Sequence, residues 1–102
     1  MKAYYDSKAD AIGIELVPVD RIDEDYAVHD TYCHVGQLDG QPFTIEFLGT
    51  PEALEYVEEA AKVTGVNPQL LVAVTKAVLA APDRDITFEF DDPFYENESL
   101  VA

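Results

Sequence analysis

Apolar and polar residues alternate in the first half of the chain, and this pattern predicts short β-strands. The clearest alternation places apolar residues at every second position in two segments: Ile12, Ile14 and Leu16, and later Phe43, Ile45 and Phe47. Such spacing gives each strand one apolar face. Asp39-Gly40 before the second segment is a hairpin signal, because glycine adopts positive φ without steric cost. With further strands expected at residues 2–5, 26–28 and 31–37, we predict an antiparallel sheet, a meander of about five strands.

The second half of the chain changes to the period of a helix. Leu54, Val57 and Ala61 recur at spacings of three and four, which places them on one side of a first helix. Thr50, which is followed by proline, is expected to cap the start of this helix. Gly65 is expected to end it.

A second helix is expected from Asn67-Pro68 to about residue 81, and it is apolar around most of its circumference. Only three of its side chains are expected to face water: Gln69, Thr75 and Lys76. Five others form a candidate interface: Leu70, Leu71, Val74, Val78 and Leu79. One small sheet cannot cover so wide an apolar surface, so we expect self-association, most simply as a two-fold dimer. The competing account is that the sheet, the first helix and a closing strand enclose this helix.

The end of the chain predicts one more strand and then a tail. Residues 85–90 alternate between polar and apolar and indicate a possible sixth strand. Residues 91–102 carry four acids and no base, and we expect them to form a flexible acidic tail. The expected fold class is therefore α+β: one domain over residues 1–90, in which a small antiparallel sheet packs against a helical hairpin.

Charge narrows the classes of partner. Twenty-one acidic and six basic side chains give a net charge of −15 at pH 7. Proteins bind phosphate backbones through Lys and Arg, which release counterions. The six bases here are scattered along the chain, so we expect neither a nucleic-acid nor a membrane partner. A strongly acidic surface favours solubility, or else a match to a basic protein.

Cysteine use and hydropathy indicate the compartment. Cys33 is the single cysteine and cannot form a disulfide within the chain, which is compatible with a reducing cytoplasm. Residues 1–6 contain no apolar segment typical of a signal peptide. No apolar run approaches the roughly 18 residues of a membrane helix. A soluble, cytoplasmic protein is therefore expected.

Two turn motifs carry a resemblance to a known family. They consist of Tyr5, Asp6, Asp10 and Ala11 before one strand, and of Asp39, Gly40, Ile45, Glu46, Phe47 and Leu48 in the hairpin and strand that follow. In these positions, residues 4 to about 50 resemble the small prokaryotic family catalogued as domain of unknown function 2283. Thr44 stands where that family usually has glycine, and Pro42 lies early in the strand. The resemblance implies a small β-rich unit, to which the helices are an extension, and it implies no activity.

The residues suited to metal binding or nucleophilic chemistry are poorly spaced for it. His29, Cys33 and His34 are the only soft metal ligands, whereas a structural zinc site takes four. Adjacent residues of a strand point to opposite faces, so Cys33 and His34 cannot bind one ion or act as a nucleophile and base. No metal, cofactor or catalytic residue is therefore assigned.

Three acids are candidates for turn capping or for function. Asp6 and Asp10 bracket a turn, where carboxylates commonly accept backbone N–H groups, although a carboxylate pair could also transfer protons. Glu46 lies in an otherwise apolar strand, where it is either a buried acid with a partner or part of a solvated face.

These observations favour a non-catalytic protein-interaction module that self-associates. One alternative is an antitoxin-like or regulatory partner that neutralises a basic protein through an acidic surface. The other is a small metal-dependent enzyme that uses carboxylates and tyrosines.

Overall fold

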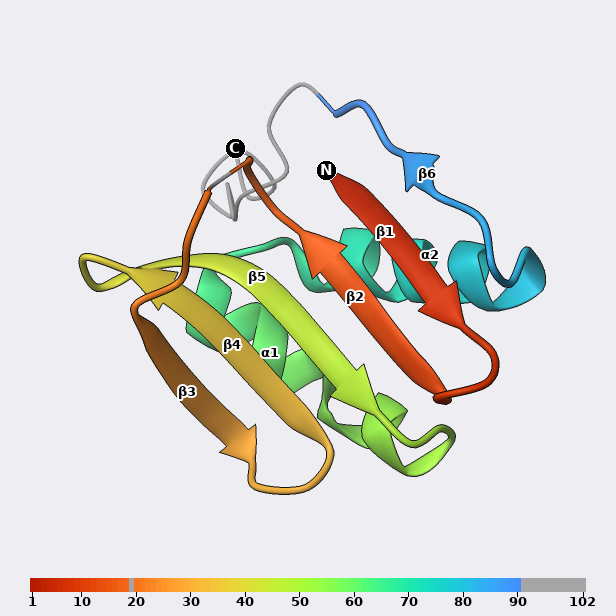
Figure 1. Cartoon of the computed structure of the whole chain (residues 1–102), viewed down its shortest axis with the longest axis horizontal. Helices are drawn as coiled ribbons and strands as arrows, with labels where there is room; N and C mark the ends of the chain where they lie inside the picture. The colour runs from red at the N-terminus through yellow and green to blue at the C-terminus, as the bar shows by residue number, and fades with distance from the viewer. Residues whose placement is uncertain (19, 91–102) are drawn as a thin grey trace, which may run out of the picture.

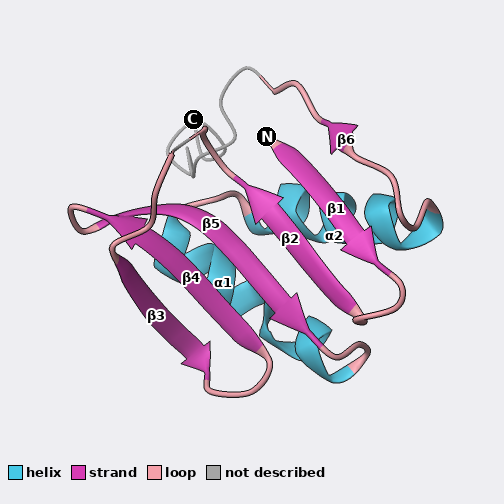
Figure 2. Cartoon of the chain, viewed as in Figure 1, coloured by secondary structure: helices cyan, strands magenta, loops and turns pink. Residues whose placement is uncertain are grey.

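The computed structural model describes residues 1–18 and 20–90, which form a six-stranded antiparallel sheet with helices on one of its faces (Figures 1 and 2). This confirms the predicted α+β class. The elements, in chain order, are β1 (Lys2–Asp6), β2 (Ala11–Glu15), β3 (Glu24–His29), β4 (Cys33–Leu38), β5 (Gln41–Leu48), the 3₁₀ helix η1 (Glu52–Tyr56), α1 (Val57–Thr64), α2 (Pro68–Ala80) and β6 (Ile86–Thr87). The predicted tail, residues 91–102, lies outside the described residues.

The order of the strands across the sheet is β3-β4-β5-β2-β1-β6, so a meander in the strict sense runs only from β3 to β5. After β2, the chain crosses to the far edge of the sheet before β3 begins (Figure 1). β2 then pairs with β5, in a register that sets Ile14 opposite Ile45 and Ile12 opposite Phe47. Because these side chains share one face, the pairing joins the β1–β2 hairpin and the β3–β5 meander into one apolar surface.

The hydrophobic core lies between that surface and the helices. α1 packs on β4 and β5, and α2 packs on β1. The largest fully buried side chains come from both layers: Ile12, Ile14, Val35, Ile45 and Phe47 from the sheet, and Leu71, Val74 and Val78 from α2. Burial of each such side chain contributes about 1.5–3 kcal/mol relative to exposure. Within the part of the chain that is described, no helix is long and apolar enough to cross a membrane.

The end of α1 and the start of α2 lie where the sequence predicts them, at Gly65 and at Asn67-Pro68. Gly65 adopts a left-handed φ of 79° at the end of α1, and its N–H donates to the Ala61 carbonyl at 2.8 Å. The Asn67 side-chain oxygen accepts from the N–H groups of Gln69 and Leu70 at the start of α2. This cap satisfies two N–H groups that a helix start leaves without backbone partners.

Two predictions about single threonines are wrong. Thr50 does not cap a helix, because its N–H and hydroxyl donate to Asp10. The helical segment that follows begins with the 3₁₀ helix η1 instead of an α-helix. Thr75 does not face water and is only 3% exposed. Its hydroxyl donates to the Val72 carbonyl at 2.8 Å, so burial leaves no polar group unsatisfied.

The two edges of the sheet differ. β6 is shorter than the predicted strand and pairs with β1 over two residues only, although the Phe88 N–H continues the contact by donating to the Met1 carbonyl. The other edge, β3, has six residues, and its register with β4 shifts between Ala27 and His29. Such a bulge increases the local twist of an edge strand.

A pair of adjacent leucines tests the core. Leu71→Ala should lower the free energy of unfolding by about 2–5 kcal/mol, because Leu71 is fully buried between α2 and the sheet. Leu70→Ala makes the same chemical change at a half-buried position and should cost clearly less. Urea denaturation followed by circular dichroism measures both. Equal losses would contradict the placement of α2.

Candidate functional site

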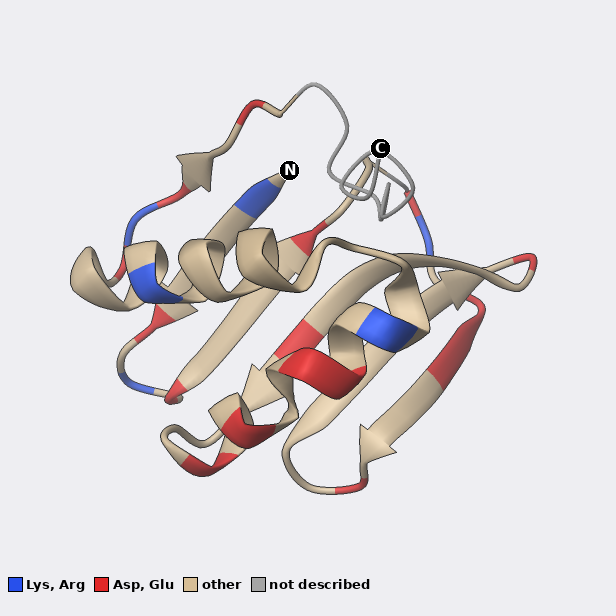
Figure 3. Cartoon of the chain, turned by 180° about the vertical axis from the view of Figure 1, so that it is seen from behind, with Lys and Arg blue, Asp and Glu red and all other residues tan. Residues whose placement is uncertain are grey.

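The face of the sheet opposite the helices is uncovered and carries a hollow of about 440 Å³. In the view from behind, both helices lie in front of the sheet and so cover the face opposite the hollow (Figure 3). The polar side chains around the hollow come from β1 to β5 and from the residue that precedes β6: Lys2, Tyr4, Glu15, Asp25, His34, Thr44, Glu46 and Asp85. This face is the candidate functional site, and we call it the open face.

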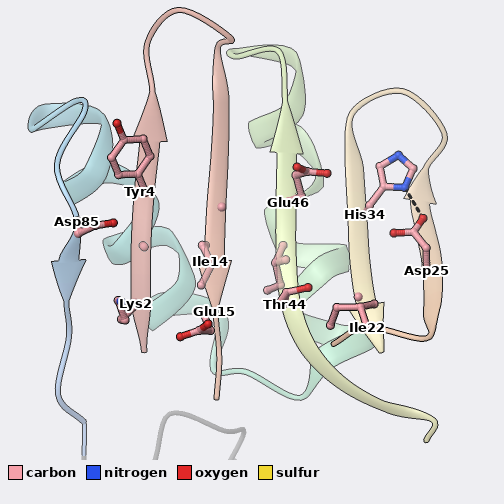
Figure 4. A pocket seen from close by; sticks show the side chains of 14 residues that line it. Lys2, Tyr4, Ile14, Glu15, Ile22, Asp25, His34, Thr44, Glu46 and Asp85 are labelled. Carbon is pink, nitrogen blue, oxygen red and sulfur yellow. Dashed lines mark hydrogen bonds and ion pairs between the residues drawn. The ribbon is translucent and has the colours of Figure 1, made fainter. Parts of the chain in front are cut away.

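Strand register arranges the open face in rows that run across the sheet. In one row, Gly13 lies opposite Tyr4 of β1 on one side and opposite Glu46 of β5 on the other. Glu46 in turn lies opposite His34 of β4. Figure 4 shows Tyr4, Glu46 and His34 at a similar level across the sheet, with β2 between Tyr4 and Glu46. Each row therefore combines side chains that are far apart in the sequence.

The two glycines of the open face have different surroundings. A Cβ on Gly36 would collide with the Thr44 hydroxyl and would lie 3.2 Å from methyl carbons of Ile22, so these side chains already occupy that space. A Cβ on Gly13 would meet no atom within 4 Å. The space above Gly13, between Tyr4 and Glu46, is therefore empty.

The open face carries more negative than positive charge. Glu46 is exposed, which answers the question of its burial, and Asp85 is exposed as well. Among the described residues, the one ion pair joins His34 to Asp25, so Glu15, Glu46 and Asp85 form no ion pair, although Lys2 lies opposite Glu15 and His34 lies opposite Glu46. Desolvation raises the pKa of the Tyr4 hydroxyl, and the nearby Asp83, Asp6 and Asp85 raise it further.

His34 is held by two acceptors. Its Nδ1 lies 2.7 Å from the Asp25 carboxylate, and its Nε2 lies 2.8 Å from the Asp30 carbonyl oxygen. Since neither acceptor can donate, both contacts are hydrogen bonds only when the ring is the doubly protonated imidazolium. The hydrogen bond to Asp25 is the main cause of the raised pKa of His34. His34 thus fastens β3 to β4, and neither ring nitrogen is free to take a proton from a substrate.

His29, Cys33 and His34 do not converge. The Nδ1 atom of His29 accepts from the N–H groups of Thr31 and Tyr32, while Cys33 lies fully buried on the helix side of β4. Burial raises the pKa of the Cys33 thiol to about 12, with a smaller effect from Glu59. Residues 1–18 and 20–90 contain no group of three potential metal ligands.

Asp6 and Asp10 both accept hydrogen bonds in the turn region, but they act separately. The Asp6 carboxylate accepts from the N–H groups of Lys8 and Ala9, as expected of a turn cap. Asp10 accepts from the Tyr5 hydroxyl at 2.8 Å and from the Thr50 hydroxyl and N–H at 2.7 and 3.0 Å. These bonds lower the pKa of Asp10 and join the β1–β2 turn to the turn after β5.

The candidate interface of α2 lies largely inside the molecule. Leu71, Val74 and Val78 are fully buried in the core, whereas Leu70 and Leu79 are half-buried. A contact between two copies through α2 would therefore rest on Leu70 and Leu79 and on neighbouring alanines. Self-association stays a prediction, with a smaller apolar surface than the sequence suggested. A charge at Val74 would test folding and not association.

Sequence reasoning missed the open face itself. Alternation revealed that one face of each strand is polar, but the rows depend on which strands are neighbours. The sequence did not indicate the empty space above Gly13, since a glycine in a strand has several explanations. Comparisons with family models, curated proteins and solved structures find no match for this chain.

The pH dependence of stability tests the state of His34. Its pKa is raised in the folded state, so its stabilising effect is complete below the unfolded pKa of about 6.5 and is lost as pH rises through the folded pKa. The difference in melting temperature between the natural chain and His34→Gln should therefore be larger at about pH 5.5 than at about pH 9. Asp25→Asn should remove the same pH dependence. A difference that does not change with pH would contradict the paired imidazolium.

Thiol labelling tests the state of Cys33. The thiol is fully buried and its pKa is raised to about 12, so a thiolate-specific disulfide reagent should leave the folded chain unmodified. The same reagent should label one thiol per chain in denaturant. Rapid labelling of the folded chain would contradict the burial of Cys33 and would favour a role for its thiol as a nucleophile.

Proposed function

We propose that this chain is a non-catalytic interaction module that binds a basic segment of a partner protein on the open face of its sheet. The observation that carries this proposal is the set of unpaired carboxylates, Glu15, Glu46 and Asp85, around a hollow on a sheet face that no helix covers. This function corresponds to the regulatory or antitoxin-like alternative, in which an acidic surface neutralises a basic protein.

Charge supports a basic partner over a second copy of the chain. At a net charge of −15, two copies repel each other, whereas a basic protein is attracted over a distance set by ionic strength. Attraction of this kind mainly raises the association rate and selects against acidic partners. Acidic residues occur in the helices as well as in the strands (Figure 3), so the specific contact has to come from the shape and chemistry of the open face.

The groups best suited to catalysis are engaged elsewhere. Both nitrogens of His34 bind acceptors, and Cys33 is buried on the opposite face. Asp6 and Asp10 hold backbone and hydroxyl groups of two turns. These contacts favour an interaction module over a metal-dependent or nucleophilic enzyme.

Matched charge removals test where the basic segment binds. The double variant Glu15→Gln with Glu46→Gln should weaken binding of a labelled peptide rich in Arg and Lys about three- to tenfold, because each exposed ion pair contributes about 0.2–1 kcal/mol. Fluorescence anisotropy at low ionic strength measures the dissociation constant.

The control double variant is Glu55→Gln with Glu58→Gln, two exposed acids on the helix side. It changes net charge by the same amount and should alter the dissociation constant less than twofold. If both double variants lose affinity equally, net charge alone explains binding and the open face is not the site.

A further inference from the structure

We infer that the empty space above Gly13 is a slot for one arginine side chain of the partner. This inference rests on the proposed function, since it names the group by which a basic segment would be recognised. The slot is defined by Gly13 as its floor, by Tyr4 and Glu46 on the two neighbouring strands as its walls, and by Glu15 beside it. Figure 4 shows Tyr4, Glu46 and Glu15 around this space.

The width of the slot follows from the sheet. Tyr4 and Glu46 lie opposite Gly13 on its two neighbouring strands, so two strand spacings, about 10 Å, separate their backbones. No side chain fills the space between them, because the central residue is glycine and no atom lies within 4 Å of where its Cβ would be. A flat side chain can therefore enter between an aromatic ring and a carboxylate.

The chemistry of the walls suits a guanidinium group. Tyr4 is 36% exposed, so its ring is accessible at the hollow, and a cation over such a ring is attracted by its π-electrons. Glu46 forms no ion pair among the described residues, although His34 lies opposite it on β4, and its carboxylate can accept two parallel N–H groups from a planar fork. A second unpaired carboxylate, Glu15, lies two residues from Gly13 along β2.

Arginine fits these walls better than lysine does. Its guanidinium is planar, stacks on aromatic rings and donates two parallel hydrogen bonds, whereas an ammonium group is compact and strongly hydrated. A lysine side chain would be attracted to the carboxylates by its charge but would not stack on the ring or donate two parallel hydrogen bonds. We therefore expect the open face to distinguish two residues of equal charge.

The test uses three labelled basic peptides that differ only at the central residue, which is arginine, lysine or the neutral analogue citrulline. The natural chain should bind the arginine peptide about three- to tenfold more tightly than the lysine peptide, and the citrulline peptide most weakly.

Gly13→Val should fill the slot without disturbing the fold, since a Cβ there meets nothing and β-branched residues favour strands. This variant should keep its melting temperature and should bind the arginine and lysine peptides with equal affinity, so that the preference for arginine is lost. Ala27→Val enlarges another exposed strand residue outside the slot and should keep that preference. If Gly13→Val does not fold, Tyr4→Leu provides the same readout by removing the ring.

The outcomes separate the slot from the function. If the natural chain binds the arginine and lysine peptides equally, or if Gly13→Val and Tyr4→Leu keep the preference for arginine, the slot is wrong while the proposed function stands. If the natural chain binds none of the basic peptides at low ionic strength, the proposed function fails and the slot fails with it.

Discussion

The pairing of β2 with β5 is the contact on which the rest of the structure depends. It sets Ile12 opposite Phe47 and Ile14 opposite Ile45, and so places the apolar residues of two separate strand units on one face. Without it, the β1–β2 hairpin would be an isolated pair of strands, which is marginally stable at best in water. With it, η1, α1 and α2 find one continuous apolar surface to cover.

The same pairing decides what remains uncovered. Because successive side chains of a strand point to opposite faces, gathering the apolar residues on one side gathers Glu15, Thr44 and Glu46 on the other. Both helices follow β5 in the chain and pack on the apolar side (Figure 1). The open face is thus a direct result of the way the core is built, and its glycines determine where it is hollow.

How far the sequence predicts this molecule depends on the range of each interaction. Local signals were sufficient for the start of β5 at Asp39-Gly40, the end of α1 at Gly65 and the start of α2 at Asn67-Pro68. The order of the strands was not predictable from alternation, because a polar–apolar pattern assigns a face to each residue but no neighbour to each strand. Thr50 shows the same limit: it has the residue type of a helix cap, yet Asp10, forty positions earlier, binds its hydroxyl and N–H. The open face required both the pattern and the strand order.

The long edge strand β3 has a consequence for the behaviour of the protein in concentrated solution. An unpaired strand edge can template the addition of another chain, the first step towards aggregates. Here Glu24 and Asp25 place negative charge at the start of that edge, and the bulge between Ala27 and His29 interrupts its regular geometry. The charge component of this protection exists only while the carboxylates are ionised. The chain's resistance to aggregation is therefore tied to pH well above its isoelectric point of about 4.1, even where the fold itself persists.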